Sequence, residues 1–318
     1  MRTGGKRDAP ARHRLMPSGT DTAAGGRSVA EQAGAPSVAD RDTASRRPVG
    51  RRREPALLAG GALAAVLALF LALPVLALVA RAVLGEALVD VVRQRVLLDA
   101  LVLSLSTTLI SLALVVTLGT PLAFVLARRR FRGAGFVETL VDLPIVLPPS
   151  VAGLALLLLL GRRGALGGPL DALGIAIPFT TIAVVVAQVF VAAPFYVRSL
   201  RSGFQAIDER VEDAARMDGA SEWDVIRRIS IPLAAPAMAA GLVMSWARAL
   251  GEFGATIMFA GNVEGRTQTL PLLVYSEFQG SLDASVAAAA ILVVAAAGVL
   301  LGVRLIRWPA AFGLRPGA

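Results

Sequence analysis

Long apolar runs alternate with short polar stretches along most of the 318-residue chain. A helix that crosses a bilayer needs about 20 largely apolar residues, and six of these runs are long enough. The pattern therefore predicts an all-α integral membrane protein, a six-helix transmembrane bundle over 55–308. The six predicted spans are 56–79, 101–127, 139–160, 180–200, 233–260 and 285–306.

Prolines interrupt several of these runs. Pro74 lies in the first span, Pro121 in the second, and Pro144, Pro148 and Pro149 lie in the third. A proline inside a helix removes one hydrogen bond, and a membrane tolerates the freed carbonyl only where protein or a water-filled path satisfies it. We expect kinked or broken helices, with the third span the least regular.

The composition excludes several kinds of chemistry. There is no cysteine, and the single histidine and single lysine, His13 and Lys6, both precede the first span. Thiolate metal sites, multi-histidine metal centres, Ser-His-Asp catalysis and a lysine-containing phosphate loop therefore lack their key residues. We expect no catalytic residue, no metal and no cofactor on this chain.

The first 54 residues carry much of the net charge of +9. They are rich in Gly, Pro, Ser, Thr and Ala with few large apolar side chains, which is typical of a disordered leader. The arginines at 46, 47 and 51–53 directly precede the first span, where positive charge sets topology and attracts anionic lipid. We prefer this interpretation to a nucleic-acid tail, and we do not expect a cleaved signal peptide.

Arginines in the short loops predict the orientation of the bundle. They gather after the second span, between the fourth and fifth, and in the tail at 309–318, whereas alternate loops hold fewer. Both termini are therefore expected in the cytoplasm of a multi-pass cell-membrane protein. Arg162 and Arg163 oppose this pattern, because they fall on the predicted outer side.

The polar segment 201–231, between the fourth and fifth spans, has the pattern of folded structure. The pattern of residues predicts a helix from Ile207 to Met217, and Gly219 suits the left-handed position that ends such a helix. Ser221, with Asp224 three residues later, predicts the cap of a second short helix, and Pro232 suits the first turn of the fifth span. An interfacial hairpin without a partner is the alternative interpretation.

The same segment resembles the EAA loop of binding-protein-dependent ABC importer permeases, whose pattern is EAA, three residues, Gly, nine residues, then I-x-L-P. Here Asp replaces Glu and Ile replaces Leu. The resemblance implies the permease (MetI-like) bundle and a coupling helix that docks on a cytoplasmic P-loop ATPase, a separate chain. The implied ATPase-coupling residues are Asp213, Ala214, Ala215, Gly219, Ser221, Trp223, Ile229 and Pro232.

The fifth span contains two charged residues, Arg248 and Glu252, four positions apart on one predicted helix face. Charges inside a membrane are costly unless they are paired or face water. A structural ion pair, a role in gating or lining the path, and direct contact with a transported ion all remain open. Gly251, Gly254 and Thr256 are further path candidates, because small residues expose the backbone.

The string ARALGEFGAT, with GN and TQTLP behind it, resembles the molybdate and sulfate branch of the same permeases, as does DLPIVLPPSVAG at 142–153. The resemblance implies import of an oxyanion, molybdate first, with sulfate, thiosulfate or tungstate as alternatives. It also implies an extracytoplasmic binding protein that delivers the ion near 261–270. A permease homodimer with its third and fifth spans around the path is expected, although a heterodimer stays open.

Two other classes of protein fit less well. A secondary transporter or channel working alone predicts inverted repeats and no folded cytoplasmic loop. An intramembrane enzyme needs general acid–base groups, whereas the only deep carboxylate, Glu252, lies beside an arginine and is therefore a poor general base.

Overall fold

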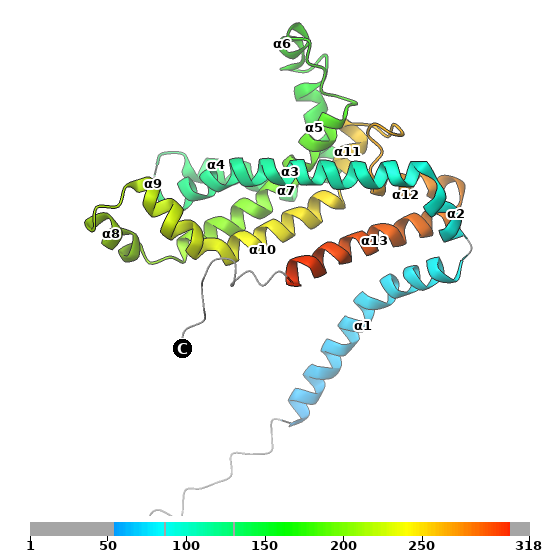
Figure 1. Cartoon of the computed structure of the whole chain (residues 1–318), viewed down its shortest axis with the longest axis horizontal. Helices are drawn as coiled ribbons and strands as arrows, with labels where there is room; N and C mark the ends of the chain where they lie inside the picture. Colours follow the sequence, from blue (N-terminus) through cyan, green and yellow to red (C-terminus); the bar gives the residue numbers. More distant parts are fainter. Residues whose placement is uncertain (1–53, 86, 130, 306–318) are drawn as a thin grey trace, which may run out of the picture. The chain divides into compact units, whose positions relative to one another are not determined.

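All regular elements are helices in the computed structural model, which describes residues 54–85, 87–129 and 131–305 (Figure 1). The fold is therefore all-α, as predicted, over the described residues. The expected leader and tail lie outside them, except that Glu54 is the first residue of α1. The helices are α1 (Glu54–Leu84), α2 (Ala87–Arg93), α3 (Arg95–Arg128), α4 (Ala134–Val146), α5 (Pro149–Leu160), α6 (Gly167–Ala172), α7 (Thr181–Gln205), α8 (Glu209–Met217), α9 (Glu222–Val225), the π-helical turn η2 (Ile226–Ser230), α10 (Ile231–Leu250), α11 (Gly254–Phe259), α12 (Leu270–Gly280) and α13 (Leu282–Leu305).

Five helical stretches in the described part of the chain are long and apolar enough to cross a membrane. Their apolar character agrees with the predicted membrane class. They are Ala59–Leu84, Arg95–Arg128, Thr181–Gln205, Glu222–Leu250 and Leu282–Gly302.

The third predicted span, 139–160, is two helices, which confirms the expectation that its prolines break it. α4 and α5 are separated at Leu147 and Pro148. Pro148 and Pro149 have no backbone N–H to continue the hydrogen-bond ladder, and Pro149 instead starts α5. At about 1.5 Å per residue, α5 is about 18 Å long, too short for the bilayer core of about 30 Å. Pro74 and Pro121, in contrast, lie within uninterrupted helices.

The fifth predicted span is displaced at both ends. Helix α9 leads through the π-helical turn into α10. Pro232 lies in the first turn of α10, as predicted, where a proline is tolerated. The other end stops at Leu250, and the chain restarts as the short α11.

The centre of the bundle is α7, which lies alongside α3 and α10 (Figure 1). Tyr196, Leu200 and Phe204 of α7 are fully buried against Val115 of α3 and Ala234 of α10. Hydrogen bonds between side chains reinforce the α3–α7 contact, where Ser111 and Thr108 of α3 pair with Gln188 of α7 at 2.9 and 3.4 Å. Because an unsatisfied polar group is costly in a membrane, this seam favours the pairing of these two faces.

A second cluster joins α2, α3, α12 and α13. Leu97 of α3, Leu270 and Leu273 of α12 and Ala287 of α13 share this core. The α12 N-terminus is fixed by a hydrogen bond from the Leu270 N–H to Ser104 Oγ, 2.7 Å long. The segment that leads from α11 into α12 is thereby held against α3.

Candidate functional site

The predicted coupling segment, 201–231, starts with the last residues of α7, and helix α8 follows, beginning two residues later than predicted. Asp208 caps it by accepting a hydrogen bond from the Arg210 N–H at 3.0 Å. The helix ends at Met217, and Gly219 has a φ of +91°. The predicted left-handed position of Gly219 is confirmed, and it turns the chain sharply towards α9.

The second half begins with the predicted cap. Ser221 Oγ accepts from the Asp224 N–H at 3.2 Å and donates to Asp224 Oδ2 at 2.6 Å. The Ser221 hydroxyl thus satisfies one N-terminal N–H of α9 and is itself held by the Asp224 carboxylate. Trp223, one residue inside this helix, is 66% exposed, and Ile226 is half-buried. The rest of the segment is continuous with α10.

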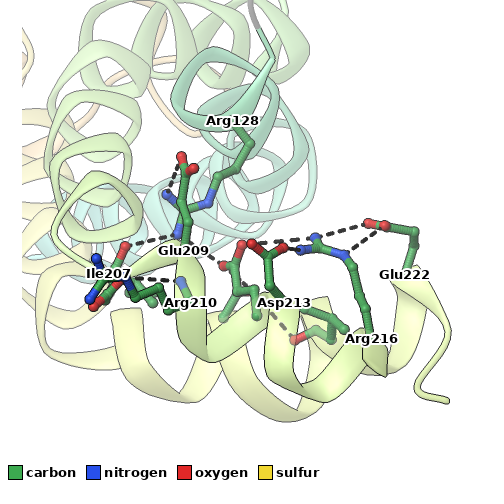
Figure 2. Close-up of polar contacts among 11 residues, drawn as sticks. Arg128, Ile207, Glu209, Arg210, Asp213, Arg216 and Glu222 are labelled. Atoms are coloured by element: carbon green, nitrogen blue, oxygen red, sulfur yellow. Dashed lines mark hydrogen bonds and ion pairs between the residues drawn. The ribbon is translucent and has the colours of Figure 1, made fainter. Parts of the chain in front are cut away.

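Arg216 joins the two halves across the turn (Figure 2). Its guanidinium donates to Asp213 at 2.8 Å and to Glu222 at 2.9 Å, so it lies between the carboxylates of α8 and α9. The hydrogen bond and the negative charge of Glu222 raise the pKa of Arg216 above its ordinary value. Of the other motif residues, Ala214 is exposed, while Ala215, Ile229 and Pro232 are half-buried.

Two further residues were missed by the sequence prediction, Glu212 and Arg128. Glu212 is only 2% exposed, and its Oε1 accepts from Arg128 Nη2 at 2.9 Å and from Ser230 Oγ at 2.8 Å. Arg128 also donates to the Ile207 carbonyl at 3.3 Å, and Figure 2 shows it reaching from α3 towards α8. The network ties the last residue of α3, the α7–α8 connection and the π-helical turn to one carboxylate.

The only sequence signal for this network is local. Glu212 lies directly before the motif and four residues before Arg216, a spacing that places both on one helix face. Arg128 is 84 residues away, in a run of arginines whose evident use is membrane topology. Such a long-range pair becomes visible only when α3 and α8 are placed together.

The predicted path residues lie at a helix break between α10 and α11. Arg248 and Glu252 form an ion pair, but not on one continuous helix as predicted, because Glu252 follows the end of α10. Glu252 is 1% exposed, and its Oε1 accepts from the Ala255 N–H at 2.7 Å. This carboxylate favours the break, since it supplies an acceptor for an N–H that begins α11.

The other path candidates have different surroundings. Gly254 lies against α5, where an added Cβ would be 2.7 Å from Pro149 Cβ, so the two broken spans meet at their breaks. Thr256 is fully buried, and its hydroxyl has no hydrogen-bond partner among the described residues. Gly251 is exposed, and Arg248 is partly exposed, with 28% of its side chain accessible.

Known proteins resemble the chain in sequence. The "Molybdenum transport system permease protein ModB" of Mycobacterium tuberculosis is 46% identical over 183 residues, 58% of this chain and 69% of that protein. The protein of the same name from Escherichia coli is 40% identical over 158 residues, 49% and 69% of the two chains. A "Probable sulfate transport system permease protein" of Chlorella vulgaris is 37% identical over 182 residues, 57% and 68%.

Solved structures share the fold. A bacterial ABC transporter involved in the import of alginate matches with a TM-score of 0.63 at 17% identity, over 80% of this chain and 97% of that one. The profile of the family described as "Binding-protein-dependent transport system inner membrane component" matches residues 119–308. These residues contain both the coupling segment and the α10–α11 break. The chain is a multi-pass membrane permease subunit of an ABC importer and belongs to the family of binding-protein-dependent transport system inner membrane components.

Proposed function

We propose that this permease subunit carries a tetrahedral oxyanion, molybdate first, across the cell membrane. The observation that supports this cargo is the greater identity to relatives named for molybdenum transport, 46% and 40%, than to the one named for sulfate, 37%. Sulfate, thiosulfate or tungstate import by the same machinery is the alternative. ATP hydrolysis takes place on a separate P-loop subunit.

The proposed orientation has both termini and the coupling segment in the cytoplasm. The arginines that cluster near the C-terminal ends of α3 and α7 and along the coupling segment support it, because positive charge is retained on the cytoplasmic side. The N-terminal end of α7 then faces outward.

The coupling segment is the proposed docking site of the ATPase subunit. Val211, Met217 and Trp223 expose 47%, 84% and 66% of their surface there, although they are large and apolar. An apolar patch rimmed by charge is typical of a protein interface. Because Glu212 ties the segment to α3 and α10, a movement of the docked ATPase is transmitted to both helices and alternates access to the path.

The proposed path passes the exposed side of the helix break, at Arg248 and Gly251. A partly exposed guanidinium offers an oxyanion a cationic group within the membrane. Two copies of the chain surround this path, and an extracytoplasmic binding protein delivers the ion to the loop at 261–270. Exposed apolar residues of α5 and α10, such as Leu158 and Met244, are available for the second copy.

Uptake of labelled molybdate tests the cargo. Cells that express the chain with its ATPase and binding protein should accumulate molybdate, and excess sulfate should compete weakly. Equal or stronger competition by sulfate would favour the alternative cargo. No ATP-dependent uptake of either ion would refute the oxyanion assignment.

Co-purification tests the docking site. Met217→Ser with Trp223→Ala removes exposed apolar surface without touching the Glu212 network, so ATPase binding should fall while the permease folds. The matched control is Leu173→Ser, which removes an equally exposed leucine from the turn before α7. Unchanged ATPase recovery with the double variant would refute docking at this surface.

A further inference from the structure

A basic cavity lies at the N-terminal end of α7, away from the coupling segment. Its volume is about 640 Å³. Three arginines come together there from two loops that are distant in sequence. The principal lining residues are Arg162, Arg163 and Arg266, with the apolar Leu157, Pro178 and Phe179.

Arg162 and Arg163 sit on a tightly built turn after α5. The Gly164 N–H donates to the Gly161 carbonyl at 2.7 Å. A Cβ at Gly161 would lie 2.2 Å from the Leu157 carbonyl oxygen, so only glycine fits. This turn holds the two guanidinium groups on a fixed backbone, which reduces the entropy lost when they bind a ligand.

Arg266 is anchored from the other side of the cavity. Its carbonyl accepts a hydrogen bond from Thr181 Oγ1, at the start of α7, at 2.9 Å. Phe179, on the same wall, has a φ of +60°, and its N–H donates to the Phe259 carbonyl at 3.3 Å. A bulky residue in this backbone region is strained, and such strain gathers at ligand clamps.

The three guanidinium groups have no carboxylate within ion-pair distance among the described residues. Arginines near the other end of α7 do have acidic partners. Arg128 pairs with Glu212, Arg201 with Glu138, and Arg216 with Asp213. The cavity therefore concentrates uncompensated positive charge beside apolar walls, where an anion is attracted more strongly than in open water.

We propose that this cavity binds a tetrahedral oxyanion on the outer side, before the ion enters the path. The side and the ligand class rest on the proposed function. Guanidinium forks match the paired oxygens of such an ion, and 640 Å³ admits it with water of hydration. The site also explains why Arg162 and Arg163 oppose the charge pattern of the other loops.

The cavity connects to the helix break through α11. Phe259, the last residue of α11, accepts the hydrogen bond from Phe179, and Glu252 accepts from Ala255 at the first turn. Six residues of helix are about 9 Å long. Helix α11 thus links a wall of the cavity to Glu252, the partner of Arg248.

Equilibrium dialysis of the full-length permease in nanodiscs tests the site, with labelled molybdate and inorganic sulfate as probes. The variant Arg162→Gln/Arg163→Gln/Arg266→Gln should bind both ions at least about tenfold more weakly than the wild type, because the charge-assisted hydrogen bonds are lost. The matched control, Arg93→Gln/Arg95→Gln, removes charge from the α2–α3 junction, on the same predicted side, and should bind like the wild type.

The outcomes separate three explanations. Equal binding by the wild type and the triple variant overturns the proposal, whatever the cargo. A phosphate-bearing lipid headgroup has the same tetrahedral chemistry, so discs of phosphatidylcholine and of phosphatidylglycerol are compared. Loss of molybdate binding only with phosphatidylglycerol assigns the cavity to lipid and overturns the oxyanion site. If cells fail to take up molybdate, the proposed cargo is wrong. Equilibrium dialysis with labelled sulfate still tests whether the cavity binds an oxyanion.

Discussion

Two buried glutamates, each paired with an arginine, act in different ways in this molecule. Glu212 pairs with Arg128, 84 residues away, and with Ser230, so it joins separate helices. Glu252 pairs with Arg248 and accepts from Ala255, so all of its partners lie within a few residues. A buried ion pair between residues far apart in sequence connects separate helices, whereas one between near neighbours stabilises only a local helix break.

The surroundings differ as well. Arg128 has 9% of its side chain exposed, so both members of its pair are withdrawn from water, whereas Arg248 has 28% exposed. Removing one partner of a fully buried pair leaves an uncompensated charge, while a partly exposed partner limits that cost. We therefore expect larger effects at Glu212 than at Glu252.

The largest effect is expected for Arg128→Met. It leaves the carboxylate of Glu212 buried with only Ser230 and a more distant Arg216, and should destabilise the α8 region by about 3–5 kcal/mol. Hydrogen exchange of the α8 amides measures this opening. The double variant Arg128→Met/Glu212→Met removes both charges and should recover most of the loss. Equal protection in the single variant and the wild type would show that the pair does not hold the segment.

A smaller effect is expected for Arg248→Gln. Glu252 keeps its hydrogen bond from Ala255 and gains access to any water that replaces Arg248, so the cost should be about 2 kcal/mol. Hydrogen exchange of the α11 amides measures this loss of stability. Adding Glu252→Gln should restore protection, since the neutral amide oxygen still accepts from Ala255. A larger loss in this double variant would indicate that charge at Glu252 is itself structural.

Gly254→Ala tests the packing of the break without changing its charge. The new Cβ would lie 2.7 Å from Pro149 Cβ and force α5 and α11 apart, at a cost of about 1–3 kcal/mol. Thermal unfolding of the purified permease should show a lower midpoint. Gly251→Ala is the matched control, because its Cβ would lie 3.5 Å from the Ala247 carbonyl oxygen, an ordinary contact distance. Equal midpoints for both variants would contradict the close α5–α11 approach.

The smallest effect is expected for Gly219→Ala in the coupling segment. No atom lies within 4 Å of the new Cβ, so the only cost is the left-handed backbone, about 1 kcal/mol. Protection of the α8 amides should fall slightly, and Gly219→Asn should lose less because asparagine tolerates this conformation. If Gly219→Ala lowered the protection of the α8 amides as much as Arg128→Met does, the turn, and not the buried pair, would be the main source of the segment's stability.

Local patterns in the sequence predicted local structure well. The cap at Ser221 and the left-handed Gly219 are present because their chemistry depends on residues three or four positions away. The membrane class and helical fold followed from long apolar runs, and the family from the motif spacing. The assignments of the coupling and path residues to ATPase docking and ion passage stay predictions.

The features that the sequence did not predict depend on tertiary contacts, or on which groups satisfy the free N–H and C=O groups at a helix end. Whether a proline kinks or ends a helix depends on what satisfies the freed groups, so Pro121 lies inside α3 while Pro148 lies at a break. At the stop after Leu250, Glu252 accepts from the Ala255 N–H, a contact that the residue types alone do not predict. The Arg128–Glu212 pair required the folded arrangement of α3 and α8.

The contacts of Glu212 also set an order of events during synthesis. Arg128 leaves the ribosome 84 residues before Glu212, whereas Ser230 follows 18 residues after it. The coupling segment therefore reaches its final shape only after α3 is in place and the turn that leads into α10 has been made. A nascent chain that stops before Ser230 carries the motif without the contact from Ser230 that holds Glu212.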